Sequence, residues 1–282
     1  MKIAKTRLEL DSILIKENNT RLTTGFVPTM GALHQGHISL IERAKSENEF
    51  VVCSIFVNPT QFNDPKDLDK YPRPIEKDLD LLEKAGCDLV FMPEITEMYQ
   101  GKEEWDHDFK ELERAWEGAM RPGHFKGVGQ IVHKLFQYVK PLKAYFGQKD
   151  YQQTLIVKQL IIDFQLNIEV IVCPIIREEN GLAMSSRNTR LSSSERDKAG
   201  IIYNTLIESK KQYQSNIDIQ DIVNSAKKTL LSDPSIELEY VAIVNSSNLK
   251  EINTKEPNIK PIMLIAIRIS GTRLIDNMYL LD

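Results

Sequence analysis

Residues 50–57 read FVVCSIFV, and this unbroken apolar run constrains the fold more than any other segment. A strand that is apolar on both sides must be covered on both sides, which is typical of parallel strands in α/β proteins. Further apolar segments of strand length lie at residues 25–28, 87–92, 144–147 and 168–172. Helical patterns separate these segments, so the sequence predicts an α/β fold with a doubly wound parallel sheet and right-handed crossovers.

The expected helices are marked by apolar residues at helical spacing and by residues that begin or end helices. Pro74 lies near the start of one helix, and Gly86 follows its end. The helices expected between the strands cover residues 8–17, 38–44, 74–85, 128–139 and 151–162, whereas the polar residues 64–71 are expected to form a loop.

The pattern changes after Arg187. Ser192 and Glu195 match a capping box, which predicts the start of a long helix over residues 192–213. A second helix is expected at residues 218–231, and strands are expected at residues 237–245, 261–269 and 273–277. Helices followed by adjacent strands indicate a second, smaller α+β domain at the C-terminal end.

The overall composition argues against several classes of protein. The net charge of −4 gives no basic surplus, so we expect no nucleic-acid partner. The N-terminal residues MKIAKTRLELDS lack an apolar signal region, and no stretch approaches the roughly 20 apolar residues of a membrane span. The three cysteines are odd in number and lie in apolar runs, which predicts buried reduced thiols. We therefore expect a cytoplasmic protein without a membrane partner.

Residues 25–45, GFVPTMGALHQGHISLIERAK, have the pattern of a strand, a tight loop and a helix. N–H groups and the dipole at a helix start favour an anion, so His34 and His37 in this loop suggest a nucleotide phosphate site. The alternative is that both are turn residues at a helix start. A zinc site is disfavoured, because the pair is close in sequence and few further ligands lie nearby. HQGH resembles the His-x-Gly-His signature of the nucleotidyltransferase superfamily, which includes class I aminoacyl-tRNA synthetases.

Three further loops carry polar groups at expected strand ends or at the domain junction: NPTQF, GQKD and MSSRN. Ser185, Ser186 and Arg187 offer two hydroxyls and a guanidinium, which are donors suited to phosphate oxygens. Lys149 adds a positive charge, and Asp150 could accept a hydrogen bond from a ribose hydroxyl. The alternatives are that Gly147 forms a simple turn, that Lys149 is a solvated charge, and that Ser185 and Ser186 cap a helix.

The segments FVPTMGALHQGH, FVNPTQF, YPR, RPGHFKGV, YFGQKDYQQ and REENGLAMSSRN occur in this order along the chain. This series closely resembles the pantothenate synthetase (pantoate–beta-alanine ligase) family. The resemblance implies an ATP-dependent ligase that condenses (R)-pantoate with β-alanine, with Mg²⁺, to give pantothenate, AMP and diphosphate through a pantoyl adenylate. It also implies a Rossmann-like nucleotide- and pantoate-binding domain at residues 1–175, a C-terminal lid domain at residues 176–282, and a homodimer.

The resemblance also implies roles for individual residues. His34 and His37 are expected to contact the phosphates, and His37 to donate a proton to the leaving diphosphate. The expected catalytic groups are completed by Lys149, Ser185, Ser186 and Arg187. The expected nucleotide site contains Met30, Gly31, His34, His37, Gly147, Gln148, Lys149, Asp150, Ile176, Met184, Ser185, Ser186 and Arg187. The expected pantoate site contains Gln61 and Gln153, with Met30 at the junction of the two sites and Asn58 and Arg121 as further contacts. No residue is assigned as a metal ligand.

Two other functions share part of this pattern. A nucleotidyltransferase that stops after AMP transfer, such as one that makes a dinucleotide cofactor, also has HxGH and a serine-rich phosphate loop. It would not be expected to carry the paired Gln61 and Gln153 or the RPGHF segment. A nucleotide sensor without turnover is the second alternative. Four intact residues argue against it: His34, His37, Lys149 and Arg187.

Overall fold

The computed structural model describes residues 1–18, 23–99, 101 and 105–281. The chain forms two compact units, each with its own core. The first unit comprises Met1–Gly147 and Gln152–Cys173, and the second comprises Gln148–Tyr151 and Pro174–Asp282. The predicted α/β class, with a parallel sheet and a smaller C-terminal α+β part, is confirmed.

The first unit contains a six-stranded parallel sheet in the order β1-β4-β3-β2-β5-β6. Its strands are β1 (Lys2–Ala4), β2 (Thr24–Thr29), β3 (Phe50–Ile55), β4 (Leu89–Phe91), β5 (Lys143–Gly147) and β6 (Glu169–Cys173). Strand β1 was not expected, because three residues are too few to show a pattern. The strand order reverses between β2 and β5, and open α/β sheets bind ligands beyond the carboxyl ends of strands at such a point.

Two helices of the first unit differ from the sequence-based prediction. The expected loop at residues 64–71 contains a short helix, which Asp64 caps by accepting the Lys66 N–H. The helix expected from Val128 begins at His124. The helical segments are α1 (Arg7–Asn18), α2 (Gln35–Glu47), η1 (Pro59–Gln61), α3 (Pro65–Asp69), α4 (Ile75–Lys84), α5 (Ile95–Met98), α6 (Glu111–Arg114), α7 (Trp116–Met120), α8 (His124–Val139) and α9 (Tyr151–Asp163).

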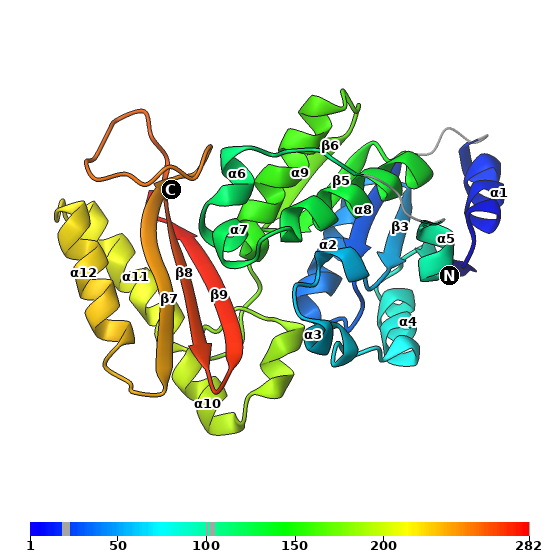
Figure 1. Cartoon of the computed structure of the whole chain (residues 1–282). Helices are drawn as coiled ribbons and strands as arrows, with labels where there is room; N and C mark the ends of the chain where they lie inside the picture. The colour runs from blue at the N-terminus through cyan, green and yellow to red at the C-terminus, as the bar shows by residue number, and fades with distance from the viewer. Residues whose placement is uncertain (19–22, 100, 102–104, 282) are drawn as a thin grey trace. The chain divides into compact units, whose positions relative to one another are not determined.

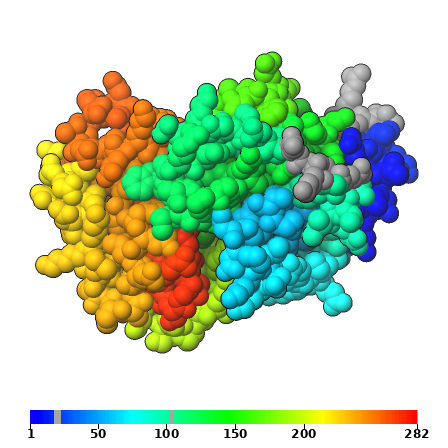
Figure 2. All heavy atoms as spheres, viewed as in Figure 1, coloured from blue at the N-terminus to red at the C-terminus, as the bar shows by residue number. Residues whose placement is uncertain are grey.

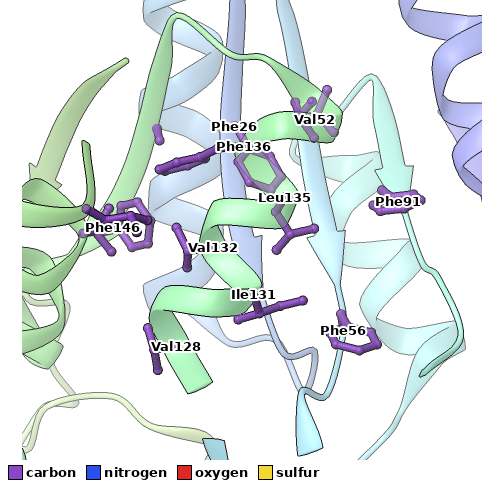
Figure 3. Close-up of a cluster of buried hydrophobic side chains, with 14 of the residues drawn as sticks. Phe26, Val52, Phe56, Phe91, Val128, Ile131, Val132, Leu135, Phe136 and Phe146 are labelled. Carbon is purple, nitrogen blue, oxygen red and sulfur yellow. The ribbon is translucent and has the colours of Figure 1, made fainter. Parts of the chain in front are cut away.

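Alternate residues of the parallel strands enter two separate cores, one on each side of the sheet. Phe26, Val52 and Phe91 pack with α8, as Figure 3 shows, where Leu135 and Phe136 point toward the strands. Their neighbours along the strands belong to a second core with residues of α2 and α4. The run FVVCSIFV is apolar at every position except Ser54, which agrees with a strand β3 that is covered by helices on both sides.

The second unit contains an antiparallel sheet in the order β7-β8-β9. Its elements are η2 (Gln148–Asp150), η3 (Ser186–Arg190), α10 (Ser193–Ala199), α11 (Ile201–Gln214), α12 (Ile219–Leu230), β7 (Ile236–Asn245), β8 (Pro261–Ile269) and β9 (Thr272–Tyr279). Helices α11 and α12 pack against this sheet (Figure 1), and Figure 2 shows α12 in yellow beside β7 in orange at the surface.

The single long helix expected at residues 192–213 is instead two helices that meet at Gly200. A Cβ atom at Gly200 would lie 2.8 Å from the carbonyl oxygen of Asn180, so the close approach of this backbone excludes a side chain there. The predicted capping box of Ser192 and Glu195 is confirmed at the start of α10. No helix in the part of the chain that the structure describes is long and apolar enough to cross a membrane.

Candidate active site

His34 and His37 cap the start of helix α2. Nδ1 of His34 accepts the Gly36 N–H at 3.1 Å, and Nδ1 of His37 accepts the His34 N–H at 3.4 Å. The two rings lie 4.1 Å apart between centroids. Because both Nδ1 atoms accept hydrogen bonds, the neutral rings carry their protons on Nε2. Both histidines therefore do act as turn residues at the helix start, as the alternative held. This leaves each imidazole in a tautomer that can donate from Nε2.

The loop before these histidines directs its N–H groups into the protein. Gly31 donates to the Thr29 hydroxyl at 3.2 Å, and the Thr29 hydroxyl donates to the Ser54 carbonyl at 2.7 Å. The N–H groups of Ala32 and Leu33 donate to the Asp78 carboxylate at 2.8 and 2.7 Å. This loop therefore differs from a phosphate-binding loop whose N–H groups face the ligand, and the groups left to attract an anion are the imidazoles and the helix dipole.

Gln61 connects the HQGH loop to a second polar cluster. Its Nε2 lies 3.0 Å from Sδ of Met30, which precedes the histidines on the same loop. Its Oε1 accepts from Nδ2 of Asn58 at 3.3 Å, and this Nδ2 also donates to the Gly127 carbonyl at 3.1 Å. The Tyr99 hydroxyl donates to Oδ1 of Asn58 at 2.7 Å. The amide of Gln61 is thus held in place from both sides.

His124 joins Gln61 to Arg121. The guanidinium of Arg121 can only donate, so Nε2 of His124, 2.9 Å from Nη1, is the acceptor. Nδ1 then carries the proton and donates to the main-chain oxygen of Gln61 at 2.8 Å. His124 is only 6% exposed, and both of its ring nitrogens have a defined role in the neutral form.

The remaining expected substrate residue, Gln153, lies in the first turn of α9 and is half-buried. Its neighbour Gln152 is buried and structural, since it donates to the carbonyls of Leu112 and Ala115 and accepts the Glu117 N–H.

The second unit carries most of the expected nucleotide residues, and buried side chains fix their backbone. Nδ2 of Asn277 donates to the carbonyls of Gln148 and Lys149 at 3.0 Å each, which orients the GQKD turn before Asp150. The Met184 N–H donates to the Ile176 carbonyl at 3.0 Å. Ser185 caps η3 by accepting the Arg187 N–H at 3.2 Å, so its hydroxyl proton can still be donated to an anion. Ser186 is the first residue of η3.

The structure therefore brings four of the five expected pantoate-site residues into one hydrogen-bonded network within the first unit: Met30, Asn58, Gln61 and Arg121. Four residues of these sites were not expected from the sequence: Asp78, Tyr99, His124 and Asn277. His124 lies in the RPGHFKGV segment, which was a usable signal. The other three are the buried Asp78 and Asn277 and the half-buried Tyr99, and the sequence does not reveal the surroundings of any of them.

No group of three or more His, Cys, Asp or Glu side chains in the described ranges is arranged to hold a metal ion. The donor set of this site consists of imidazoles, amides, hydroxyls and a guanidinium. Such groups suit phosphate oxygens, whereas Mg²⁺ prefers oxygen ligands and is often held by phosphates and water.

Comparisons with known proteins match nearly the whole chain. A family model described as pantoate-beta-alanine ligase matches residues 2–279. The pantothenate synthetase of Cytophaga hutchinsonii is 47% identical over 269 residues, covering 95% of each chain, and that of Bacteroides fragilis is 42% identical over 278 residues, covering 99% of this chain and 98% of the relative.

Solved structures match along nearly the whole chain. Pantothenate synthetase from Thermus thermophilus superposes with a TM-score of 0.94 at 40% identity and covers 99% of both chains. A Francisella tularensis pantoate-beta-alanine ligase, solved with beta-gamma ATP and beta-alanine, has a TM-score of 0.81 at 37% identity, covering 99% of this chain and 98% of that one. The family model, the relatives and the structures all show that this chain belongs to the pantoate-beta-alanine ligase family.

Proposed function

We propose that this protein is a pantothenate synthetase that condenses (R)-pantoate with β-alanine in an ATP-dependent reaction. The contact between Nε2 of Gln61 and Sδ of Met30 carries the proposal. It ties the amide assigned to pantoate to the loop that holds His34 and His37. Adenylation requires the pantoate carboxylate and the α-phosphate of ATP to be neighbours, and this contact brings their binding groups together.

In the first step, a carboxylate oxygen of pantoate attacks the α-phosphorus of ATP. The bond from this phosphorus to the bridging oxygen breaks, and diphosphate leaves while pantoyl adenylate remains. Nε2–H of His37 donates toward the leaving diphosphate, and His34 donates to the phosphates beside it. Lys149, Ser185, Ser186 and Arg187 complete the donors on the phosphate side. Preorganised donors of this kind are each worth roughly 3 kcal/mol in comparable sites.

In the second step, the amine of β-alanine attacks the carbonyl carbon of the adenylate, AMP leaves and the amine loses a proton. Adenylation is needed because the leaving group of a free carboxylate would be oxide. Gln61 and Gln153 hold the pantoate hydroxyls, since an amide both donates and accepts hydrogen bonds.

The remaining parts of the proposal concern the setting of the reaction. Bound Mg²⁺ would neutralise charge on the phosphate oxygens, held by the phosphates and water. Residues 1–175 would bind the nucleotide and pantoate, and residues 176–282 would act as a lid that excludes water from the adenylate. A cytoplasmic homodimer is part of the same proposal.

The proposal is tested by following diphosphate and AMP with ATP, Mg²⁺, pantoate and β-alanine. We expect diphosphate release that requires pantoate, and AMP release that additionally requires β-alanine. AMP transfer to a nucleotide without a response to pantoate would identify a nucleotidyltransferase instead. ATP binding without turnover under all these conditions would identify a sensor.

Variants of His37 test its proposed proton donation. His37→Asn keeps an acceptor near Nδ1 for the His34 N–H but lacks Nε2, so we expect diphosphate release to fall at least about a hundredfold with the fold retained. His133→Gln on α8 is the control, because His133 lies in a separate aromatic cluster with Trp105 and Phe164. Near-normal turnover of His37→Asn would remove His37 from the mechanism.

A further inference from the structure

The loop from Thr29 to His34 has a backbone that needs external support. Gly31 and Ala32 both lie in the left-handed region, with φ of 81° and 51°. For Ala32 this conformation is strained, because its Cβ crowds the backbone. The surrounding contacts must therefore hold the loop in this shape.

Asp78 on helix α4 supplies those contacts. Its two carboxylate oxygens accept the N–H groups of Ala32 and Leu33 at 2.8 and 2.7 Å, one oxygen for each donor. The loop also fits closely against the carboxylate. A Cβ atom at Gly31 would lie 3.0 Å from Oδ2 of Asp78 and 3.1 Å from Cγ2 of Ile55 on β3.

Asp78 is fully buried, at 0% exposure, and within the described ranges no Lys, Arg or His forms an ion pair with it. Burial raises the pKa of its carboxyl, and the two N–H donors of Leu33 and Ala32 oppose that rise. Its position in the first turn of α4 places the carboxylate near the positive end of the helix dipole. Burying a carboxylate costs desolvation free energy. The hydrogen bonds that hold the loop offset this cost.

We propose that Asp78 is a positioning residue for adenylation, which sets the places of Met30 and His34 by fixing the two N–H groups that lie between them in the chain. Met30 comes two residues before Ala32, and His34 directly follows Leu33. Because the carboxylate is buried and both of its oxygens accept loop N–H groups, it acts through the loop. This inference rests on the proposed function, since it concerns the same site.

Asp78→Asn tests the proposal with little change in shape. The amide oxygen of Asn can accept only one of the two N–H groups on its side, and its NH₂ group would face the other N–H, so donor would oppose donor. Asp80→Asn is the matched control, because Asp80 lies two residues further along α4, is exposed and pairs only with Lys84 among the described residues.

We expect Asp78→Asn to lower kcat/KM for ATP at least tenfold, to leave the KM for pantoate within about threefold, and to leave the reaction of preformed pantoyl adenylate with β-alanine within about threefold. Asp80→Asn should match the wild type in all three. A fall in kcat by the same factor in the overall reaction and in the reaction of preformed pantoyl adenylate, with both KM values unchanged, would mean a smaller active fraction and would overturn the positioning role.

A second variant separates positioning from stability. Ala32→Gly removes the cost of the left-handed backbone, so it should restore the melting temperature of Asp78→Asn without restoring kcat/KM for ATP. Recovery of both in the double variant would overturn the proposal.

Binding of a non-hydrolysable ATP analogue, measured by calorimetry, does not depend on the acyl substrate. We expect the analogue to bind Asp78→Asn at least tenfold more weakly than it binds the wild type. This result is expected even if the true acyl substrate is an acid other than pantoate and the proposed function fails. Equal affinity for the wild type and this variant would contradict the role of Asp78 alone.

Discussion

The Tyr99 hydroxyl lies 2.7 Å from Oδ1 of Asn58 and donates a hydrogen bond to it. Oδ1 also accepts from the Thr60 hydroxyl at 3.1 Å, while Nδ2 donates to Gly127 and Gln61. An Asn side chain has two donor hydrogens and two acceptor lone pairs, so all four are used within the protein. Asn58 is 1% exposed, so we expect it to affect a substrate only through Gln61.

Tyr99→Phe should weaken pantoate binding while leaving the chemical step nearly unchanged. Loss of one hydrogen bond of about 1 kcal/mol frees Asn58 to rotate, so the KM for pantoate should rise about fivefold and kcat should change less than twofold. Tyr138→Phe is the control, because Tyr138 packs under Arg7 and against Phe91 in another part of the unit. An unchanged KM for pantoate in Tyr99→Phe would show that Asn58 needs no support from Tyr99.

Two substitutions of His124 should separate its two hydrogen bonds. His124→Asn retains a donor near Nδ1 for the main-chain oxygen of Gln61, and His124→Gln retains an acceptor near Nε2 for Arg121. We expect His124→Asn to keep the melting temperature closer to that of the wild type, because it satisfies the buried carbonyl of Gln61. If Arg121 contacts substrate, His124→Gln should keep the lower KM for pantoate. Identical behaviour of the two variants in both assays would contradict this division.

The sheet could be predicted from the sequence because its physical signal is local. A strand covered on both faces is apolar at nearly every position, as in FVVCSIFV with Ser54 as its polar residue, and its pairing partners need not be known to recognise it. Gly200 shows the limit of such reasoning. Where α10 and α11 meet, the Asn180 carbonyl lies so close to Gly200 that a side chain would not fit, and no local pattern reports this contact from twenty residues earlier.

The residues of the candidate site also fall into two groups, those that the sequence motifs indicated and those that only the structure reveals. Motifs indicated Gln61 and the histidines, since chemistry requires particular residue types there. Asp78 and Asn277 support the motif backbones through contacts across 45 and 128 or more residues of sequence, so they look like ordinary polar residues in the sequence. The sequence suggested an anion-binding loop at HQGH, but only the structure shows that its N–H groups at Ala32 and Leu33 are occupied by Asp78.

The three cysteines should resist alkylation in the native protein. Cys53, Cys87 and Cys173 are buried and unpaired, as the sequence predicted. Burial raises the pKa of all three thiols, that of Cys87 to about 12, so almost no thiolate is present at pH 8. After treatment with iodoacetamide at pH 8, mass spectrometry should detect no labelled cysteine in the native protein and label on all three cysteines in the denatured protein. Rapid labelling of the native protein would contradict this packing.

The cap of helix α10 should make stability depend on acid pH. The Ser270 hydroxyl and the Ser192 N–H both donate to Glu195 and lower the pKa of its carboxyl below the ordinary 4.5. A lowered pKa in the fold means that the stabilisation is present above pH 4.5 and is lost as pH falls through the lowered value.

Glu195→Gln removes this charge, so we expect a lower melting temperature than that of the wild type at pH 6 and a smaller gap at pH 3. Thermal unfolding of the two proteins at both pH values measures the gap. A gap of the same size at pH 6 and pH 3 would contradict the assignment of this charge to the cap.

Two glycines in the family segments should respond to alanine in opposite ways. A Cβ atom at Gly127 would lie 2.5 Å from the carbonyl oxygen of Thr60, because the first turn of α8 crosses the backbone of η1 there. Gly127→Ala should therefore destabilise the protein by about 1–3 kcal/mol and displace Gln61. At Gly147 no described atom lies within 4 Å of an added Cβ, so Gly147→Ala should change the free energy of unfolding by less than about 0.5 kcal/mol.

The methyl group of Gly147→Ala would instead occupy open space at the carboxyl end of β5, near where we propose that the nucleotide binds. We expect its KM for ATP to rise about tenfold with an unchanged melting temperature, whereas Gly127→Ala should lower the melting temperature and raise the KM for pantoate. Denaturation curves and steady-state kinetics of the two variants measure these effects. If Gly147→Ala bound ATP as the wild type does, the nucleotide would have to lie away from the end of β5.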